Sequence, residues 1–348
     1  MRALYSQYAS ALATLYTDVE NYARGTSTVF PGTAGSVLER SNAQGFRFFA
    51  RQYYDGAGKK REQYLAGPIG DPAAEQLVGN IRKRIGELKE VVSHLRLLGR
   101  EGFNLVDSKT YATIASLHND GFFRAGAVLV GSHAYGTLLN QLGARAAPYA
   151  TQDVDIARPT KLAFAHVPDK TFIQTLRESG IDFFEVPQLN RREPGTSFKE
   201  PGRSFFQVDL LVPSRSAQTR TVPVPELKAH ATALPYLAYL LGECQDSVLL
   251  AREGCCLVRV PVPERFALHK LIVSQLRTAR AQKSAKDVSQ AAVLLAILSE
   301  RHPGSIEGAA EHLPKSALRY VRVAATLARQ QLPAHHRAIE ILDTLGFK

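Results

Sequence analysis

The stretch that decides the fold is AVLVGSHAYGTLLNQLG, residues 127–143. Its first four residues are apolar and are typical of a short buried strand, and the pattern after Gly131 and Ser132 predicts a helix to about Leu142. The first N–H groups of such a helix lack partners and its dipole favours anions, so the turn predicts a phosphate site. Gly131 allows the backbone to approach closely, and Ser132 can donate its hydroxyl to a phosphate oxygen.

Three aspartates lie in two later runs that are typical of strands, 152–157 and 205–212. Asp153 and Asp155 are two positions apart, so in a strand their side chains share one face and repel each other without a cation between them. Asp209 lies in the second run, where an apolar strand tolerates a carboxylate poorly without a partner. Three strand-borne carboxylates that converge on one point predict a site for hard divalent cations, most naturally Mg²⁺.

An Asp-x-Asp pair alone is weak evidence, because such pairs are common on protein surfaces. Metal-dependent glycosyltransferases also use Asp-x-Asp, but they lack the preceding strand, Gly-Ser turn and helix and the lone strand aspartate. The ordered combination of phosphate turn and three aspartates favours a nucleotidyl-transfer site with two Mg²⁺ ions.

The order hG-S-x(3)-G, D-x-D and a lone strand D resembles the polymerase β-type nucleotidyltransferase superfamily. The segment GSHAYGTLLNQLG, followed by TQDVDIA, is most similar to a bacterial branch related to the AbiEii-type toxins of toxin–antitoxin and abortive-infection systems. The resemblance implies that Gly131 and Ser132 hold the triphosphate of an NTP and that Asp153, Asp155 and Asp209 hold two Mg²⁺ ions. Ser132 and Asp153 lie further apart than in minimal members, which predicts an insertion around 143–149.

A further basic element follows Pro263, where a helix is expected to about Arg280 and a second from Ser284 to Glu300. The segments RFALHKLIVSQLR and KSAKDVSQAAVLL resemble the downstream pattern of the AbiEii-like branch. That resemblance implies a catalytic Lys270 that contacts the phosphates, and an Asp287 that orients a basic partner or the helix pair. The alternative is an amphipathic helix whose Lys270 reaches solvent and an Asp287 that complements a helix dipole.

The segment before the turn predicts a small extension of different character. A first helix is expected at 2–24, a β-hairpin at 46–54 and 59–65, and a long helix opened by Asp71 and Pro72. The apolar spacing in that helix predicts that one stripe of side chains is buried, and the stripe comprises Leu77, Ile81, Ile85, Leu88, Val92 and Leu95. The hairpin also resembles the N-terminal extension of the AbiEii-like branch.

Basic and aromatic residues alternate along this hairpin. The basic residues predict contact with a polyanionic acceptor, and the aromatic rings offer surface for base stacking. The alternative is that the aromatic rings only pack on the helix that follows. The basic positions are Arg47, Arg51, Lys59, Lys60 and Arg61.

The fold class expected from these patterns is α+β, with a polymerase β-like nucleotidyltransferase core built on a mixed sheet. Three parts are predicted: a hairpin and helix extension at 1–105, the core at 106–262 and a helical domain at 263–348. The segment 195–202 is rich in Gly, Pro and Ser and predicts a loop. No internal period of 20 to 50 residues indicates a solenoid.

Composition is consistent with a chain that acts on polyanions. The 348 residues include 43 Lys and Arg against 32 Asp and Glu, a formal net charge of +11, which favours nucleic acid or triphosphate partners, although solubility alone would also explain it. Three cysteines, two of them adjacent, fit a reducing compartment and a buried position for Cys255 and Cys256. Neither an export signal nor a membrane-spanning apolar run is apparent, so a cytoplasmic location is expected.

The expected function is therefore a nucleotidyltransferase of the 2.7.7 class. It would move a nucleoside monophosphate from an NTP, ATP among the candidates, to a hydroxyl on RNA such as tRNA or on a protein. If the toxin resemblance holds, an antitoxin protein is a candidate partner. The alternative from another class is a non-catalytic nucleic-acid-binding protein on the same fold.

Overall fold

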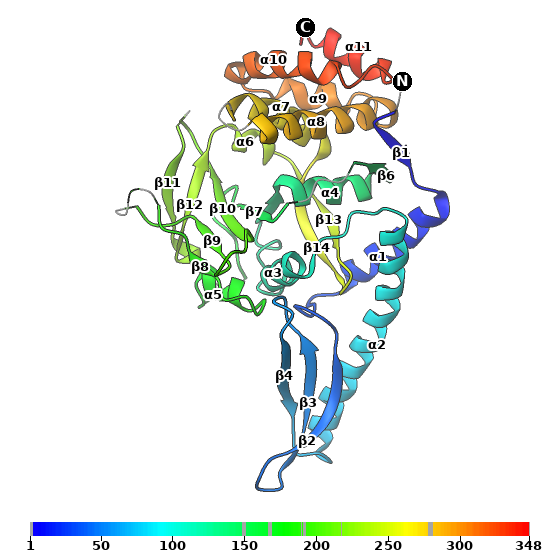
Figure 1. The fold of residues 1–348 in the computed structure, drawn as a ribbon, viewed down its shortest axis with the longest axis vertical. Coiled ribbons are helices and arrows are strands. Elements are labelled where there is room, and N and C mark those ends of the chain that lie inside the picture. Colours follow the sequence, from blue (N-terminus) through cyan, green and yellow to red (C-terminus); the bar gives the residue numbers. More distant parts are fainter. Residues whose placement is uncertain are drawn as a thin grey trace.

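The protein has a mixed α+β fold, described here from a computed structural model (Figure 1). A twisted central sheet is covered by helices, a helical layer lies at the end that holds both termini, and a small sheet with a long helix projects from the other end. The structure describes residues 3–147, 151–165, 169–188, 190, 193–216, 218–277 and 281–347.

The central sheet is mixed, in the strand order β11-β12-β10-β7-β5. Strand β10 is parallel to both of its neighbours β7 and β12, whereas β5 and β11 are antiparallel edge strands. The strands are β5 (Val128–Val130), β7 (Asp153–Ala157), β10 (Gln207–Pro213), β11 (Arg220–Val224) and β12 (Ala229–Leu234). Two short strands, β8 (Phe184–Glu185) and β9 (Ser197–Lys199), extend the sheet beside the start of β10.

Apolar side chains on alternate strand positions form the core beneath this sheet. Val154, Ile156, Val208 and Leu210 are each at most 1% exposed, so the aspartates between them face the other side. The surrounding elements are α3 (Ser108–Asn119), α4 (Gly131–Gln141), α5 (Phe172–Arg177), α6 (Leu237–Leu240) and the hairpin β13 (Cys244–Leu250) and β14 (Cys255–Pro261). The predicted burial of Cys255 and Cys256 is confirmed.

The C-terminal part is helical and shares one continuous core with the central sheet. Its first two helices pack side by side, and every residue from Ala291 to Leu298 is at most 4% exposed, because other elements cover this part of the second helix on all sides. The helices are α7 (Pro263–Leu276), α8 (Ala281–Arg301), α9 (Ser305–Glu311), α10 (Leu318–Arg329) and α11 (His336–Thr344).

The N-terminal part forms the projecting arm, and its first strand lies at the opposite end of the molecule (Figure 1). Helix α2 (Pro72–Arg100) packs on α1 (Ser10–Gly25) and, at its start, on a three-stranded sheet. That sheet comprises β2 (Ser36–Ser41), β3 (Arg47–Tyr54) and β4 (Lys60–Ala66). The first strand β1 (Tyr5–Gln7) pairs with β6 (Ala144–Ala146), next to the C-terminal helices (Figure 1).

Several predicted elements are confirmed, and others need correction. The hairpin, the Asp71 cap and the strands that hold the aspartates form as expected, whereas the first helix begins at Ser10 because β1 takes residues 5–7. The predicted stripe of α2 is confirmed at Ile85, Leu88 and Leu95, which are buried, and Ile81 and Val92 are half-buried. At its start the prediction is wrong, because Leu77 is 46% exposed and Val78 is buried in its place. The predicted loop at 195–202 contains β9, and the predicted helix to Arg280 ends at Leu276, with 278–280 outside the described residues.

The predicted insertion at 143–149 contains β6, and its last two residues fall outside the described part of the chain. The division of the chain at residues 105 and 262 stays a prediction. No helix within the described residues is long and apolar enough to cross a membrane.

Candidate active site

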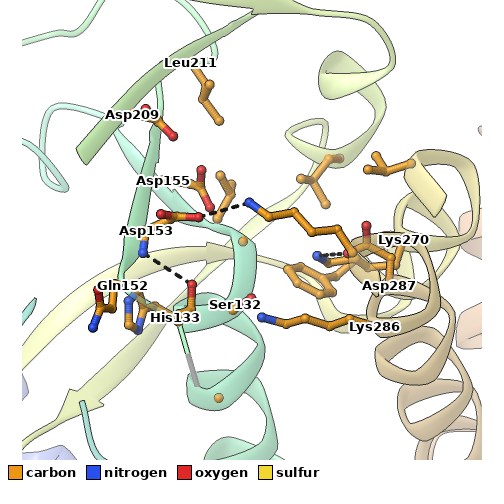
Figure 2. Close-up of a pocket in the computed structure, with 18 of the residues that line it drawn as sticks. Ser132, His133, Gln152, Asp153, Asp155, Asp209, Leu211, Lys270, Lys286 and Asp287 are labelled. Atoms are coloured by element: carbon orange, nitrogen blue, oxygen red, sulfur yellow. Dashed lines mark hydrogen bonds and ion pairs between the residues drawn. The ribbon is translucent and has the colours of Figure 1, made fainter. Parts of the chain in front are cut away.

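Strand pairing places the aspartates in one row across the sheet. Asp155 on β7 is opposite Val130 on β5 and also opposite Asp209 on β10, and Asp209 is in turn opposite Ser197 on β9. Asp153 precedes Asp155 by two positions and therefore shares its face. Figure 2 shows the three carboxylates on the same side of the sheet.

Gly131 brings the start of α4 against this row. Its φ of +69° favours glycine, and a Cβ at this position would overlap Oδ2 of Asp155. No side chain caps the N-terminus of α4, whose N-cap residue is Val130. The first N–H groups of an 11-residue helix therefore lie beside a carboxylate and face a cleft, which is the arrangement that binds phosphate when a cation offsets the carboxylate charge.

The carboxylates lie where ionisation is costly. Burial and the charge of Asp209 raise the pKa of Asp155 from 3.8 to about 7. Burial also raises the pKa of Asp209, whose Oδ1 is buried without a hydrogen-bond partner while Oδ2 accepts from Nε2 of Gln207 at 3.1 Å. Among the described residues, neither Asp155 nor Asp209 forms a direct ion pair, although the charge of Lys270 offsets part of the rise in the pKa of Asp155.

Asp153 differs from the other two because a lysine neutralises it. Its Oδ2 lies 3.3 Å from Nζ of Lys283 on α8, and both side chains are partly exposed to the cleft. Sequence reasoning did not identify Lys283, because its only distinguishing feature there is its position four residues before Asp287. Lys286 was missed too: its side chain extends from α8 toward Ser132 (Figure 2), and burial lowers its pKa.

Lys270 forms a buried network with Asp287 rather than reaching bulk solvent. Its Nζ donates to Oδ1 of Asp287 at 2.7 Å, and Nη1 of Arg277 donates to Oδ2 at 2.9 Å. The side chains of Lys270 and Asp287 are 8% and 1% exposed. The implied role of Asp287, to orient a basic partner or the helix pair, is compatible with this network, because it joins α7 to α8.

All six predicted catalytic and binding residues line a single cleft of about 1520 Å³. They are Gly131, Ser132, Asp153, Asp155, Asp209 and Lys270. The lining combines polar residues, which include these six and the lysines of α8, with apolar side chains. The apolar side chains include Leu211, Leu234, Leu237, Leu240, Phe266 and Val273, of which Phe266 and Val273 lie on α7 with Lys270. Such a cleft can hold a ligand with a charged end and a flat apolar end.

The donor set fits a hard cation. The unpartnered Oδ1 of Asp209 lies beside the raised-pKa carboxyl of Asp155, and both supply the oxygen atoms that Mg²⁺ prefers. Within the described residues, however, no group of three His, Cys, Asp or Glu side chains is already close enough to enclose a metal ion. The third carboxylate, that of Asp153, is paired with Lys283.

Comparison with known families shows to which family the chain belongs. A family model described as Nucleotidyltransferase matches residues 108–314, which is 207 of the 348 residues. The chain belongs to this nucleotidyltransferase family. The match begins after the projecting arm and includes every cleft residue discussed above. No curated protein and no solved structure matched the chain.

Proposed function

We propose that this nucleotidyltransferase moves a nucleoside monophosphate from an NTP to a hydroxyl acceptor and releases pyrophosphate, with Mg²⁺ as cofactor. The observation that supports the proposal most is the adjacent Asp155 and Asp209 pair, which forms no direct ion pair with any described residue and lies beside the uncapped start of α4. The positive charge of a bound cation and the negative charge of a phosphate would offset each other at this point. We also propose that the core is polymerase β-like and that the chain belongs to the AbiEii-related branch.

The phosphates would lie at the start of α4. Backbone N–H groups after Gly131 and the Ser132 hydroxyl would donate to phosphate oxygens. Lys286, whose side chain extends toward Ser132, would add positive charge at the same place (Figure 2). Lys270 has three ammonium donors, so it can hold Asp287 and still donate to a phosphate.

Asp153, Asp155 and Asp209 would hold two Mg²⁺ ions. When bound, Mg²⁺ neutralises the triphosphate and favours ionisation of the acceptor hydroxyl. Asp153 would first have to release Lys283, which leaves that ammonium in the cleft beside the phosphates. Apolar side chains of the lining, such as Leu211, Leu234 and Leu237, would contact the nucleoside.

The acceptor would be RNA, such as tRNA, or a protein hydroxyl. A role as the toxin of a toxin–antitoxin or abortive-infection system, with an antitoxin protein as partner, follows only from the resemblance and is part of the proposal. Exposed basic residues on the arm and the overall charge of +11 favour RNA.

Calorimetry with Mg²⁺ and each of the four NTPs tests this function. We expect NTP binding that requires Mg²⁺, and loss of it in Asp209→Asn, which removes one oxygen ligand without changing the shape of the side chain. A second assay incubates the protein with each α-labelled NTP and total cellular RNA or protein, and should label one acceptor class. Binding of RNA with no response to Mg²⁺ or NTP would instead favour the non-catalytic alternative.

A further inference from the structure

The loop before β10 exposes an aromatic ring at the mouth of the cleft. Phe205 is 76% exposed, more than any other large hydrophobic residue in the described part of the chain, and it lines the cleft that holds the aspartates. Its neighbour Phe206 is 2% exposed and anchors the loop in the core. Exposing a whole phenylalanine ring to water is unfavourable, so a ligand that covers this ring would gain the free energy of its burial.

Two basic residues, Lys199 and Arg203, belong to the same segment as Phe205. Nζ of Lys199 on β9 lies 5.7 Å from the centroid of the Phe205 ring, and Arg203 is exposed two residues before it. The one acidic residue between Lys199 and Phe205 is Glu200, and Lys109 neutralises it at 2.6 Å. The loop therefore presents an aromatic face with two cations, which complements a base and its flanking phosphates.

The row of paired strand positions places this loop on one side of the aspartates. From Val130 the row runs through Asp155 and Asp209 to Ser197. The proposed phosphate site begins directly after Val130, at one end of the row. Phe205 precedes Asp209 by four residues, which is at most about 14 Å of extended chain, and Lys199 follows Ser197, at the other end.

The two ends of the row match the geometry of phosphoryl transfer. The attacking and leaving oxygens lie roughly in line on opposite sides of the transferred phosphorus. With the triphosphate at the α4 end, the acceptor hydroxyl must approach from the side of Asp209 and β9. An acceptor that enters there passes Phe205.

We infer that Phe205, Lys199 and Arg203 form the acceptor platform and that the acceptor is the end of a single-stranded nucleic acid, whose terminal region stacks a base on Phe205. The inference rests on the proposed function, since it names the acceptor class of that same site. A serine or threonine hydroxyl of a protein brings no flat ring, and a tyrosine hydroxyl brings a ring without the flanking phosphates that Lys199 and Arg203 would bind.

The absence of tryptophan from the sequence permits a direct test. Phe205→Trp gives a protein with a single indole at the platform, and stacking of a base on it quenches its fluorescence. Val323→Trp is the matched control, because Val323 is 57% exposed on α10 and does not line the cleft. Titration with short single-stranded RNA and DNA oligonucleotides should quench the first indole and leave the second unchanged, and the two series compare RNA with DNA.

Affinity measurements separate stacking from simple apolar contact. Phe205→Ala and Phe205→Leu should weaken oligonucleotide binding by about 5- to 150-fold, and Phe205→Tyr should retain it. Lys199→Gln should make the salt dependence of oligonucleotide binding shallower. Affinity for NTP with Mg²⁺ should be the same in all four variants.

Two results would overturn the inference while leaving the proposed function intact: binding of NTP with Mg²⁺ but no quenching of the Phe205→Trp indole by any oligonucleotide, or stronger quenching by a hydroxyl-bearing peptide. Quenching by oligonucleotides without any binding of NTP would have the opposite meaning. It would support the platform and refute the nucleotidyl transfer.

Discussion

Gly131 and Asp155 share a space that has no room for a second side chain. A Cβ at position 131 would overlap Oδ2 of Asp155, although the two residues belong to different elements, α4 and β7. Because the carboxylate and the helix start are this close, a ligand that contacts the first N–H groups of α4 lies within reach of Asp155 as well. The glycine therefore joins the proposed phosphate site to the proposed metal site.

Gly131→Ala should abolish measurable NTP binding. The variant combines the strain of a positive φ, roughly 1 to 2 kcal/mol for a residue with a Cβ, with displacement of the Asp155 carboxylate. Gly143→Ala is a matched control, because Gly143 has a similar φ of +64° at the other end of α4 and only an ordinary contact with Arg301. Calorimetry and thermal unfolding of both variants distinguish the effects: equal loss of NTP binding in the two would show that strain alone is responsible.

The raised pKa of Asp155 predicts a pH dependence of stability in the absence of metal. A carboxyl whose pKa is higher in the folded state than in the unfolded state keeps its proton better when folded. The contribution of Asp155 to the free energy of unfolding should therefore fall as the pH rises from about 3.8 to about 7, and it should not change further at higher pH. Other groups titrate in the same window, so the difference between wild type and a variant is the informative quantity.

Asp155→Asn removes this titration with little change of shape. In the presence of a chelator, its stability relative to wild type should increase from pH 5 to pH 8, as measured by denaturant unfolding. Asp246→Asn serves as the control, since Asp246 is exposed on β13. A stability difference for Asp155→Asn that does not change with pH would show that Asp155 ionises normally.

The centre of the site could be predicted because its signals are local. Alternation along β7 fixes which face Asp153 and Asp155 share, and the turn chemistry of Gly131 and Ser132 follows from their place between a strand and a helix. Asp209 is aligned with Asp155 by the register of the two neighbouring strands, which the structure shows and the sequence alone did not determine. The inferences about β7 and the turn did not depend on how distant helices pack.

The residues that sequence reasoning missed depend on tertiary contacts. Lys283 meets Asp153 across 130 positions, and only the packing of α8 over the cleft brings them together. Phe205 opens the run 205–212 that predicted a strand, but the observed strand begins at Gln207, so the exposure of Phe205 could not be read from that pattern. Leu77 and Val78 are adjacent, and apolar spacing alone could not decide which of them α2 buries.

Ser132→Ala should weaken NTP binding by about 1 to 3 kcal/mol, the range for a lost hydrogen bond to a charged group. The effect should be absent for the corresponding nucleoside, which has no phosphate, so the nucleoside is the control ligand. Competition binding with both ligands measures the difference. Equal weakening of both would place the Ser132 hydroxyl at the nucleoside instead of the phosphates.

The network around Asp287 predicts a large cost for removing its charge. Asp287→Asn leaves the ammonium of Lys270, whose side chain is 8% exposed, without its counterion. Breaking a buried ion pair in this way typically costs about 3 to 5 kcal/mol of stability. Addition of Lys270→Met should recover most of that loss but not NTP binding. Arg277→Met alone should cost at most about 1 kcal/mol, because the Arg277 side chain is 42% exposed.

The arm offers fewer free cations to an acceptor than its sequence predicts. Arg51 is 4% exposed, its guanidinium donates to the carbonyls of Ala34 and Thr33, and it lies 4.1 Å from the ring centroids of Phe30 and Tyr53. The prediction that Arg51 contacts the acceptor is therefore wrong, since its role is to hold β3 to the preceding segment. Arg61 pairs with buried Asp55 at 2.7 Å, and Arg47 with Glu39 at 2.9 Å.

On the hairpin β3–β4, Lys59 and Lys60 are the exposed cations that form no ion pair with any described residue, and they lie beside the 53%-exposed ring of Tyr54. Replacing both by Ala should weaken acceptor binding and reduce the slope of log K against log salt by about 1.4 for a single strand, since each phosphate contact contributes about 0.7. Lys83→Ala with Lys89→Ala removes the same charge from exposed positions on α2 and should have a smaller effect. NTP binding should be unchanged in both double variants, because none of these lysines lines the cleft. If the salt slope is the same in the two double variants and in wild type, the arm does not contact the acceptor. Its role is then structural, and its sheet serves only to pack against α2.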